Sequence, residues 1–149
     1  MKNFILFLRA NTNMDPGAFS DPKEIEDRMD LIIVESPSKA KTITKYLKGK
    51  YRVDASAGHI RDLPVHTLGV NLKNNFEPKY VNSEGKEDVI RRLTDATKRA
   101  DRVYLATDPD REGEAIAWHL QTVLGLDETG QNRIEFNEVS KSAIEAALK

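Results

Sequence analysis

Apolar residues fall in short runs separated by longer polar stretches. Residues 31–34 are four consecutive apolar residues, as expected of a strand whose two faces are both covered. Residues 103–106 form a second run of this kind, residues 51–55 alternate between polar and apolar, and residues 133–137 show a weaker strand pattern. The pattern therefore predicts about four strands.

Between these strands, apolar residues recur at the spacing of helices. Ser36 is predicted to cap a first helix that begins at Pro37 and ends at Gly49. Residues 89–96 trace a second helical face, a third helix runs from about residue 111 to Gly125, and a fourth begins at Ser140. Strands and helices alternate, which predicts an α/β fold with a mainly parallel sheet and helices on both faces.

Two stretches stand apart from this alternation. Residues 1–29 contain turn-forming residues and no sustained hydrophobic period, so we treat them as an N-terminal extension ahead of a domain at residues 30–149. The extension is either unstructured or packs as a strand at 4–8 and a short helix at 23–29. The connection from Gly58 to about Ser83 is long for a compact domain, and such connections are usually functional or mobile.

Composition narrows the classes of function. The 149 residues include 23 basic and 24 acidic ones, a net charge of -1, so any contact with nucleic acid must be local. The chain has no cysteine, which excludes disulfides, thiolate zinc sites and a cysteine nucleophile. The apolar run at 4–8 is too short to cross a membrane. We expect a soluble, cytoplasmic chain without membrane contact.

Four carboxylates fall at the predicted carboxyl ends of strands. Glu35 follows the first strand, while Asp108, Asp110 and Glu112 follow the third and lead into a helix. Side chains from such strand ends converge in open parallel sheets. Four negative charges in one place favour a hard divalent cation, so the sequence predicts a Mg²⁺ site, with Mn²⁺ as a substitute.

Lys39 and Arg111 lie near these carboxylates in sequence and are suited to contact phosphate oxygens. Together with a metal ion they indicate phosphoryl transfer. The alternative is that Asp108 and Asp110 only cap the helix that follows them. Glu35 favours the metal site, because a charged residue at the end of a second buried strand needs its own explanation.

Three long motifs resemble the TOPRIM domain of type IA DNA topoisomerases, most closely the bacterial branch. They are residues 34–43 (VESPSKAKTI), 58–64 (GHIRDLP) and 106–120 (ATDPDREGEAIAWHL), with shorter matches at 76–80 and 136–138. The similarity covers about residues 30–149, and the motifs occur in the order of that family. The resemblance implies a TOPRIM, Rossmann-like fold.

The resemblance also assigns roles to residues. It implies that Asp108, Asp110 and Glu112 bind the metal, and that Glu35 assists proton transfer at the departing 3′ oxygen and approaches the metal. It places Lys39 against the phosphate as a cation. Arg111 belongs to the same motif, and we expect it to contribute to catalysis.

In that family a tyrosine attacks the phosphodiester, and it lies in a later domain. None of the four tyrosines in this sequence matches it. We therefore expect this chain to be a monomeric fragment, inactive alone, that acts on single-stranded DNA in a full-length enzyme whose C-terminal domains carry the tyrosine.

His59 and Arg61 are predicted to line the DNA groove, against the alternative that Arg61 pairs with Asp62.

Two other functions compete with a topoisomerase. A primase or a TOPRIM nuclease shares the acidic residues but lacks the motif at 58–64. A non-catalytic receiver-like α/β domain also binds Mg²⁺ through carboxylates. In a receiver the acidic cluster ends the first strand, whereas in this sequence most of it ends the third strand.

Overall fold

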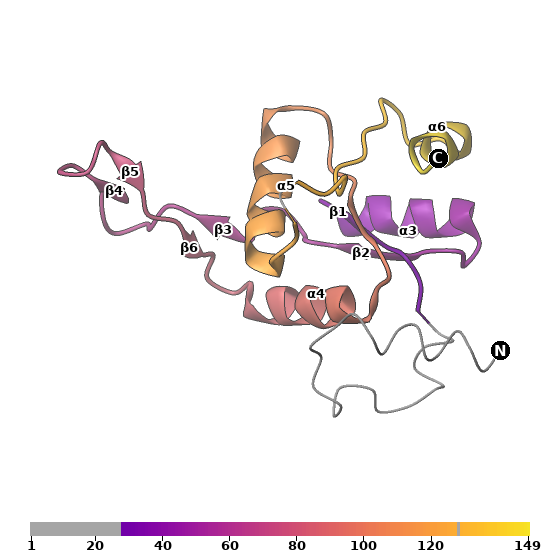
Figure 1. Cartoon of the computed structure of the whole chain (residues 1–149), viewed down its shortest axis with the longest axis horizontal. Coiled ribbons are helices and arrows are strands. Elements are labelled where there is room, and N and C mark those ends of the chain that lie inside the picture. The colour runs from indigo at the N-terminus through magenta and orange to yellow at the C-terminus, as the bar shows by residue number, and fades with distance from the viewer. Residues whose placement is uncertain (1–27, 128) are drawn as a thin grey trace, which may run out of the picture.

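Three parallel strands form the centre of the molecule (Figure 1). The computed structural model describes residues 28–127 and 129–149. Strand β1 (Leu31–Val34) lies between β2 (Arg52–Ala55) and β7 (Val103–Leu105), giving the order β2-β1-β7. All four residues of β1 are buried, as the continuous apolar run predicts.

One face of the sheet packs on two helices, α4 (Glu87–Arg99) and α5 (Arg111–Leu124). Leu31 and Ile33 of β1 join Leu93 of α4 and other buried side chains from α5 in one hydrophobic cluster. Side chains alternate across a strand, so the remaining residues of β1 must point to the other face. This explains why no polar residue interrupts the run.

The opposite face is covered by α3 (Pro37–Leu47) and α6 (Lys141–Ala147). Ile32 and Val34 pack there with Ile43 and Ile144 in a second cluster. Helices thus lie on both faces of a parallel sheet, and the predicted fold class is confirmed. Helix α3 ends at Leu47, slightly earlier than predicted, because Lys48 adopts the left-handed conformation ahead of Gly49.

The predicted fourth strand at 133–137 is reduced to one bridge, between Leu105 and Arg133, within the described residues. The Leu105 N–H donates to the Asn132 carbonyl at 2.6 Å, and the Ile134 N–H donates to the Leu105 carbonyl at 3.1 Å. Pairing stops there because β7 ends at Leu105 and the chain turns away toward Asp108. Ile134 and Phe136 remain buried, so the alternating pattern reflects packing.

The long connection forms an arm that projects from the sheet (Figure 1). It contains two short antiparallel ladders, β3 (Arg61–Asp62) with β6 (Val81–Asn82), and β4 (Val70–Asn71) with β5 (Glu77–Pro78). Its functional or mobile character stays a prediction.

Two further expectations concern the N-terminal extension and the membrane. The strand predicted at 4–8 and nearly all of the helix predicted at 23–29 lie outside the described residues. No helix in the ranges 28–127 and 129–149 combines the length and apolar character that crossing a membrane requires.

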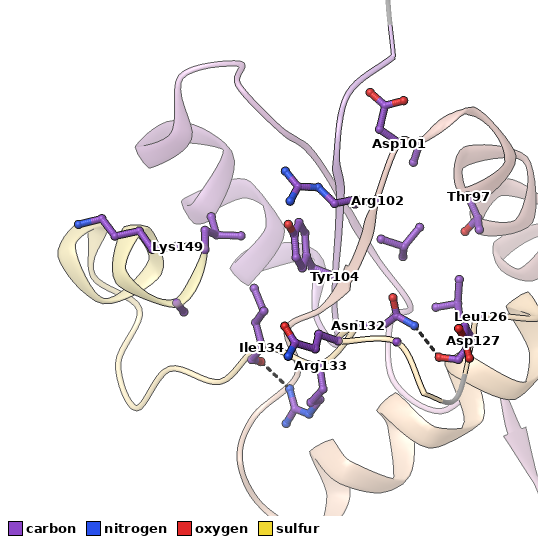
Figure 2. A pocket seen from close by; sticks show the side chains of 16 residues that line it. Thr97, Asp101, Arg102, Tyr104, Leu126, Asp127, Asn132, Arg133, Ile134 and Lys149 are labelled. Carbon is purple, nitrogen blue, oxygen red and sulfur yellow. Dashed lines mark hydrogen bonds between the residues drawn. The ribbon is translucent and has the colours of Figure 1, made fainter. Parts of the chain in front are cut away.

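A hollow of about 770 Å³ opens beside the start of β7 (Figure 2). Arg102, Tyr104 and Ile134 line it, together with Lys149 near the end of the chain. The predicted acidic residues do not line this hollow, although Arg133, which does, also donates to the Asp108 carbonyl.

Candidate metal centre

The turn between β1 and α3 places Glu35 and Lys39 over the end of the sheet. Ser36 has an extended backbone, with φ of −127°, and its hydroxyl accepts a hydrogen bond from the Lys39 N–H at 3.3 Å. Pro37 occupies the first helical position, where its missing N–H costs nothing. The cap fixes the first turn of α3 and directs Lys39 back toward Glu35, with which it forms an ion pair.

The turn between β7 and α5 is equally constrained. The Asp110 carboxylate accepts a hydrogen bond from the Gly113 N–H at 2.7 Å, so Asp110 caps α5 as the capping alternative predicted. The buried Thr107 hydroxyl donates to the Gly113 carbonyl at 2.7 Å. These two bonds hold residues 108–110, called the acidic turn below, against the first turn of α5.

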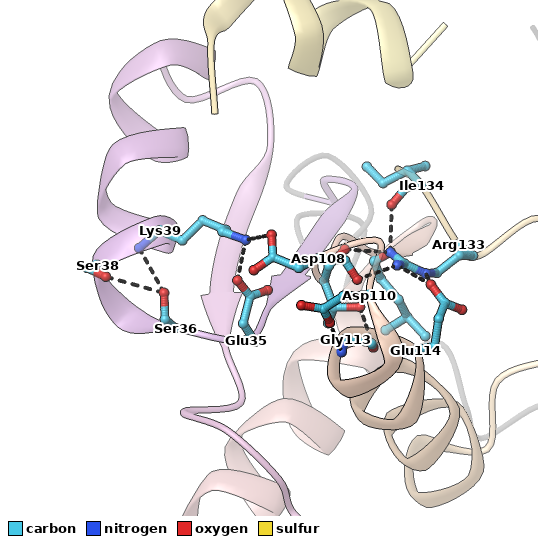
Figure 3. A network of polar contacts seen from close by, with 12 residues as sticks. Glu35, Ser36, Ser38, Lys39, Asp108, Asp110, Gly113, Glu114, Arg133 and Ile134 are labelled. Carbon is cyan, nitrogen blue, oxygen red and sulfur yellow. Dashed lines mark hydrogen bonds and ion pairs between the residues drawn. The ribbon is translucent and has the colours of Figure 1, made fainter. Parts of the chain in front are cut away.

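A single ammonium group joins the two turns (Figure 3). Lys39 Nζ lies 2.6 Å from Asp108 Oδ1 and also contacts Glu35 Oε1. Partial burial pulls the pKa of Lys39 down, but hydrogen bonds to Asp108 and Glu35 outweigh it and leave that pKa above 10.5. The Lys39 hydrogen bond in turn lowers the pKa of Asp108 below 3.8. Lys39 and Asp108 are therefore both charged at neutral pH.

The side chains at this edge are of the chemical kind that a hard cation binds. Glu35 Oε2 is buried with no hydrogen-bond partner among the described residues, so one carboxylate oxygen is left unsatisfied beside Lys39. The donors are carboxylate oxygens, the ligands that Mg²⁺ and Mn²⁺ accept. Lys39 already holds a positive charge between two carboxylates from different turns.

The predicted site residues are only partly gathered. Glu35, Lys39 and Asp108 are in contact, whereas the exposed Glu112 carboxylate lies 3.7 Å from His59 Nε2. Arg111 is exposed at the start of α5. Within residues 28–127 and 129–149, no three carboxylates or histidines are grouped closely enough to hold one metal ion together. Binding of a metal by Asp108, Asp110, Glu112 and Glu35 stays a prediction.

Residues 30–139 match the family described as the Toprim domain. This match covers most of the chain. The chain belongs to the Toprim domain family. The parallel sheet with helices on both faces agrees with that assignment.

The fold is also similar to that of a solved structure, full-length topoisomerase I from Thermotoga maritima. The TM-score is 0.74 and the sequence identity 46%, over 79% of this chain and 20% of that chain. Together the two matches confirm the resemblance to the Toprim domain of bacterial type IA topoisomerases. The chain spans about a fifth of the length of the protein that it matches.

Gly113 of this Toprim domain permits a close approach that a side chain would prevent. A Cβ atom placed on Gly113 would lie 1.9 Å from the Asp108 carbonyl oxygen and 2.8 Å from its carbon. Its helical backbone conformation suits any residue, so the requirement for glycine comes from this contact alone. Sequence reasoning treated Gly113 only as part of a motif, because a contact with the preceding turn leaves no local signal.

Arg133 is a residue that sequence reasoning missed. Its guanidinium donates to the carbonyls of Leu105, Thr107 and Asp108 at 3.1, 2.9 and 3.1 Å, and pairs with Glu114 at 2.5 Å (Figure 3). It thereby fixes the backbone from the end of β7 through the acidic turn. Arg133 begins the weak strand pattern in the sequence, which gives no indication of this role.

Arg133→Ala is expected to lower the free energy of unfolding by about 2–3 kcal/mol, because it leaves the partly buried carbonyls of Thr107 and Ile134 without a donor and breaks the ion pair with Glu114. Urea unfolding measures the change. Arg91→Ala is the matched control, since it removes the same charge and one ion pair, to Asp88, at a site where both side chains are exposed. That change should cost less than about 1 kcal/mol. Equal losses in the two variants would show that Arg133 does not fix the turn.

Proposed function

We propose that this Toprim chain supplies the metal-binding and proton-handling part of the active site of a type IA DNA topoisomerase. The substrate is single-stranded DNA, which the full-length enzyme cleaves and reseals through a tyrosine in a later domain. The similarity to topoisomerase I supports this assignment, and the primase, nuclease and receiver-like alternatives are not favoured. The proposal places the enzyme in the cytoplasm, with the chain itself monomeric.

The observation that carries the proposal is the Lys39 ammonium held between Glu35 and Asp108. These residues come from two βα turns that are far apart in sequence, and the parallel sheet brings them together. A phosphate group bound at this edge of the sheet would contact charged side chains from both turns.

Asp108, Asp110 and Glu112 would hold Mg²⁺, with Mn²⁺ as a substitute, and Glu35 would approach it. Bound there, the metal ion would neutralise negative charge on the phosphodiester. Asp110 has a second task, because one of its oxygens caps α5. That cap holds the Asp110 side chain against the first turn of α5.

Lys39 acts as a cation toward the phosphate and not as a base. Its raised pKa keeps the ammonium protonated at neutral pH, and the same charge lowers the pKa of Asp108 and keeps that carboxylate ionised. The unpartnered Oε2 of Glu35 is the oxygen available to hold a proton for the departing 3′ oxygen. Arg111, exposed at the start of α5, would contact a phosphate oxygen as the strand enters.

The site is tested by titrating Mg²⁺ into the chain while recording amide NMR shifts. We expect the shifts to cluster at Glu35 and at residues 108–112, with the largest at Asp108. A parallel titration with KCl at matched ionic strength controls for screening. Shifts confined to other amides at saturating Mg²⁺ would refute the proposed metal site. The exposed acidic residues at the start of α4 are an example of such other positions.

A further inference from the structure

Aromatic and cationic side chains gather where Trp118 of α5 meets Arg61 of β3 and Tyr80, the residue before β6. The Tyr80 and Trp118 rings meet edge to face, with centroids 5.3 Å apart. The Arg61 guanidinium lies 5.1 Å from the Tyr80 centroid and 5.7 Å from that of Trp118. Trp118 is 47% exposed, so much of a large aromatic surface faces solvent.

This cluster continues the edge that carries the acidic turn. Arg111 and Trp118 are seven residues apart on α5, which places them on the same face about 10 Å apart along the helix axis. The segment that carries Arg61 runs along the same helix, because His59, two residues earlier, lies 3.7 Å from Glu112. A strand bound at the acidic turn would reach Trp118 within a few nucleotides.

The chemistry of the cluster favours a nucleobase over an apolar partner. Nη1 of Arg61 is buried without a hydrogen-bond partner among the described residues, so a cation with unused donor capacity lies against the Tyr80 ring and the half-exposed Trp118 ring. Arginine beside aromatic faces is the combination on which bases of single strands stack. His119 packs edge-on to Tyr80 at 4.8 Å and is only 6% exposed, so it supports the rings from below.

We propose that Trp118, Tyr80 and Arg61 form a stacking platform for a base of single-stranded DNA, a few nucleotides from the scissile phosphate. The DNA ligand rests on the proposed function, while the platform adds a contact that the metal site does not need. Its role is to hold one base so that the phosphate a few nucleotides along the strand lies at the acidic turn. This deepens the predicted DNA role of Arg61 and assigns one to Trp118 and Tyr80.

Trp118 is the chain's only tryptophan, so its fluorescence reports on the platform directly. We expect a thymidine pentanucleotide to quench this fluorescence and an abasic pentanucleotide of the same charge to leave it unchanged. Trp118→Ala should weaken binding of the thymidine strand about 5- to 150-fold, as loss of one stacked base predicts. Trp118→Phe is the matched control and should retain most of the affinity, measured by anisotropy of labelled strands.

A second measurement does not depend on how well Trp118→Ala folds. Irradiating the wild-type chain with a 5-iodouracil strand should crosslink Trp118 or Tyr80, identified by mass spectrometry of the peptides. Equal affinity of the thymidine and abasic strands, unchanged fluorescence at millimolar strand, or crosslinks only elsewhere would overturn the platform. Such a result would leave the Mg²⁺ shifts at Asp108 intact, so failure of the platform and failure of the metal site are distinguishable.

Discussion

Gly113→Ala is expected to weaken Mg²⁺ binding at least about 10-fold and to lower the free energy of unfolding by about 3 kcal/mol. The added methyl group would lie 1.9 Å from the Asp108 carbonyl oxygen, a backbone atom that cannot rotate away. The acidic turn must therefore move off α5, which strains the Asp110 cap and the Thr107 bond to the Gly113 carbonyl. Urea unfolding and the Mg²⁺ titration measure the two effects.

Gly85→Ala separates this steric effect from the general cost of replacing glycine. Gly85 has φ of +75° and open space around the position of a Cβ atom. Alanine there should cost about 1–2 kcal/mol through backbone strain alone and should leave the Mg²⁺ shifts unchanged. If Gly113→Ala and Gly85→Ala gave the same unfolding free energy and the same Mg²⁺ shifts, the close approach of Gly113 to Asp108 would not be required for metal binding.

Changing Asp108 and Asp110 together to alanine is expected to reduce relaxation of supercoiled plasmid by more than about 100-fold in the proposed full-length enzyme. The double change removes two predicted metal ligands, the Lys39 partner from the second turn and the cap of α5. Relaxation is followed by gel electrophoresis over a range of Mg²⁺ concentrations, because residual metal binding would appear as activity at high Mg²⁺.

Asp95→Ala with Asp101→Ala is the matched control for that experiment. Both residues are exposed and lie away from the acidic turn, on α4 and ahead of β7, so the same two charges are removed. Relaxation should stay within about twofold of the wild-type rate, since isolated surface charges contribute little. Undiminished Mg²⁺-dependent relaxation by the Asp108 and Asp110 variant would contradict the predicted role of these carboxylates.

The features that sequence could predict are those encoded by neighbouring residues. The run at Leu31–Val34 requires apolar side chains on both faces, and the two clusters on either side of the sheet confirm it. Ser36, Ser140 and Gly125 sit at helix ends because capping depends on the few backbone groups next to them. Convergence of Glu35 and Asp108 followed from the parallel order of their strands.

The features that sequence could not predict depend on distant contacts. Arg133 reaches the carbonyls of the acidic turn from 25 residues away, and the pattern around it suggested a strand instead. The direction of each carboxylate was equally hidden: Asp110 turns to the Gly113 N–H and Glu112 lies near His59. Spacing places these groups on one turn, but competition among nearby donors decides which way each points.

The contact between Arg133 and the acidic turn also bears on the order in which the domain folds. A growing chain has Glu35, Lys39 and Asp108 in place well before Arg133 emerges from the ribosome. Until then the carbonyls of Leu105, Thr107 and Asp108 lack the donors that fix them. Because Arg133 is synthesised after the turn that it fixes, the acidic turn should become rigid only once the chain has grown past Arg133.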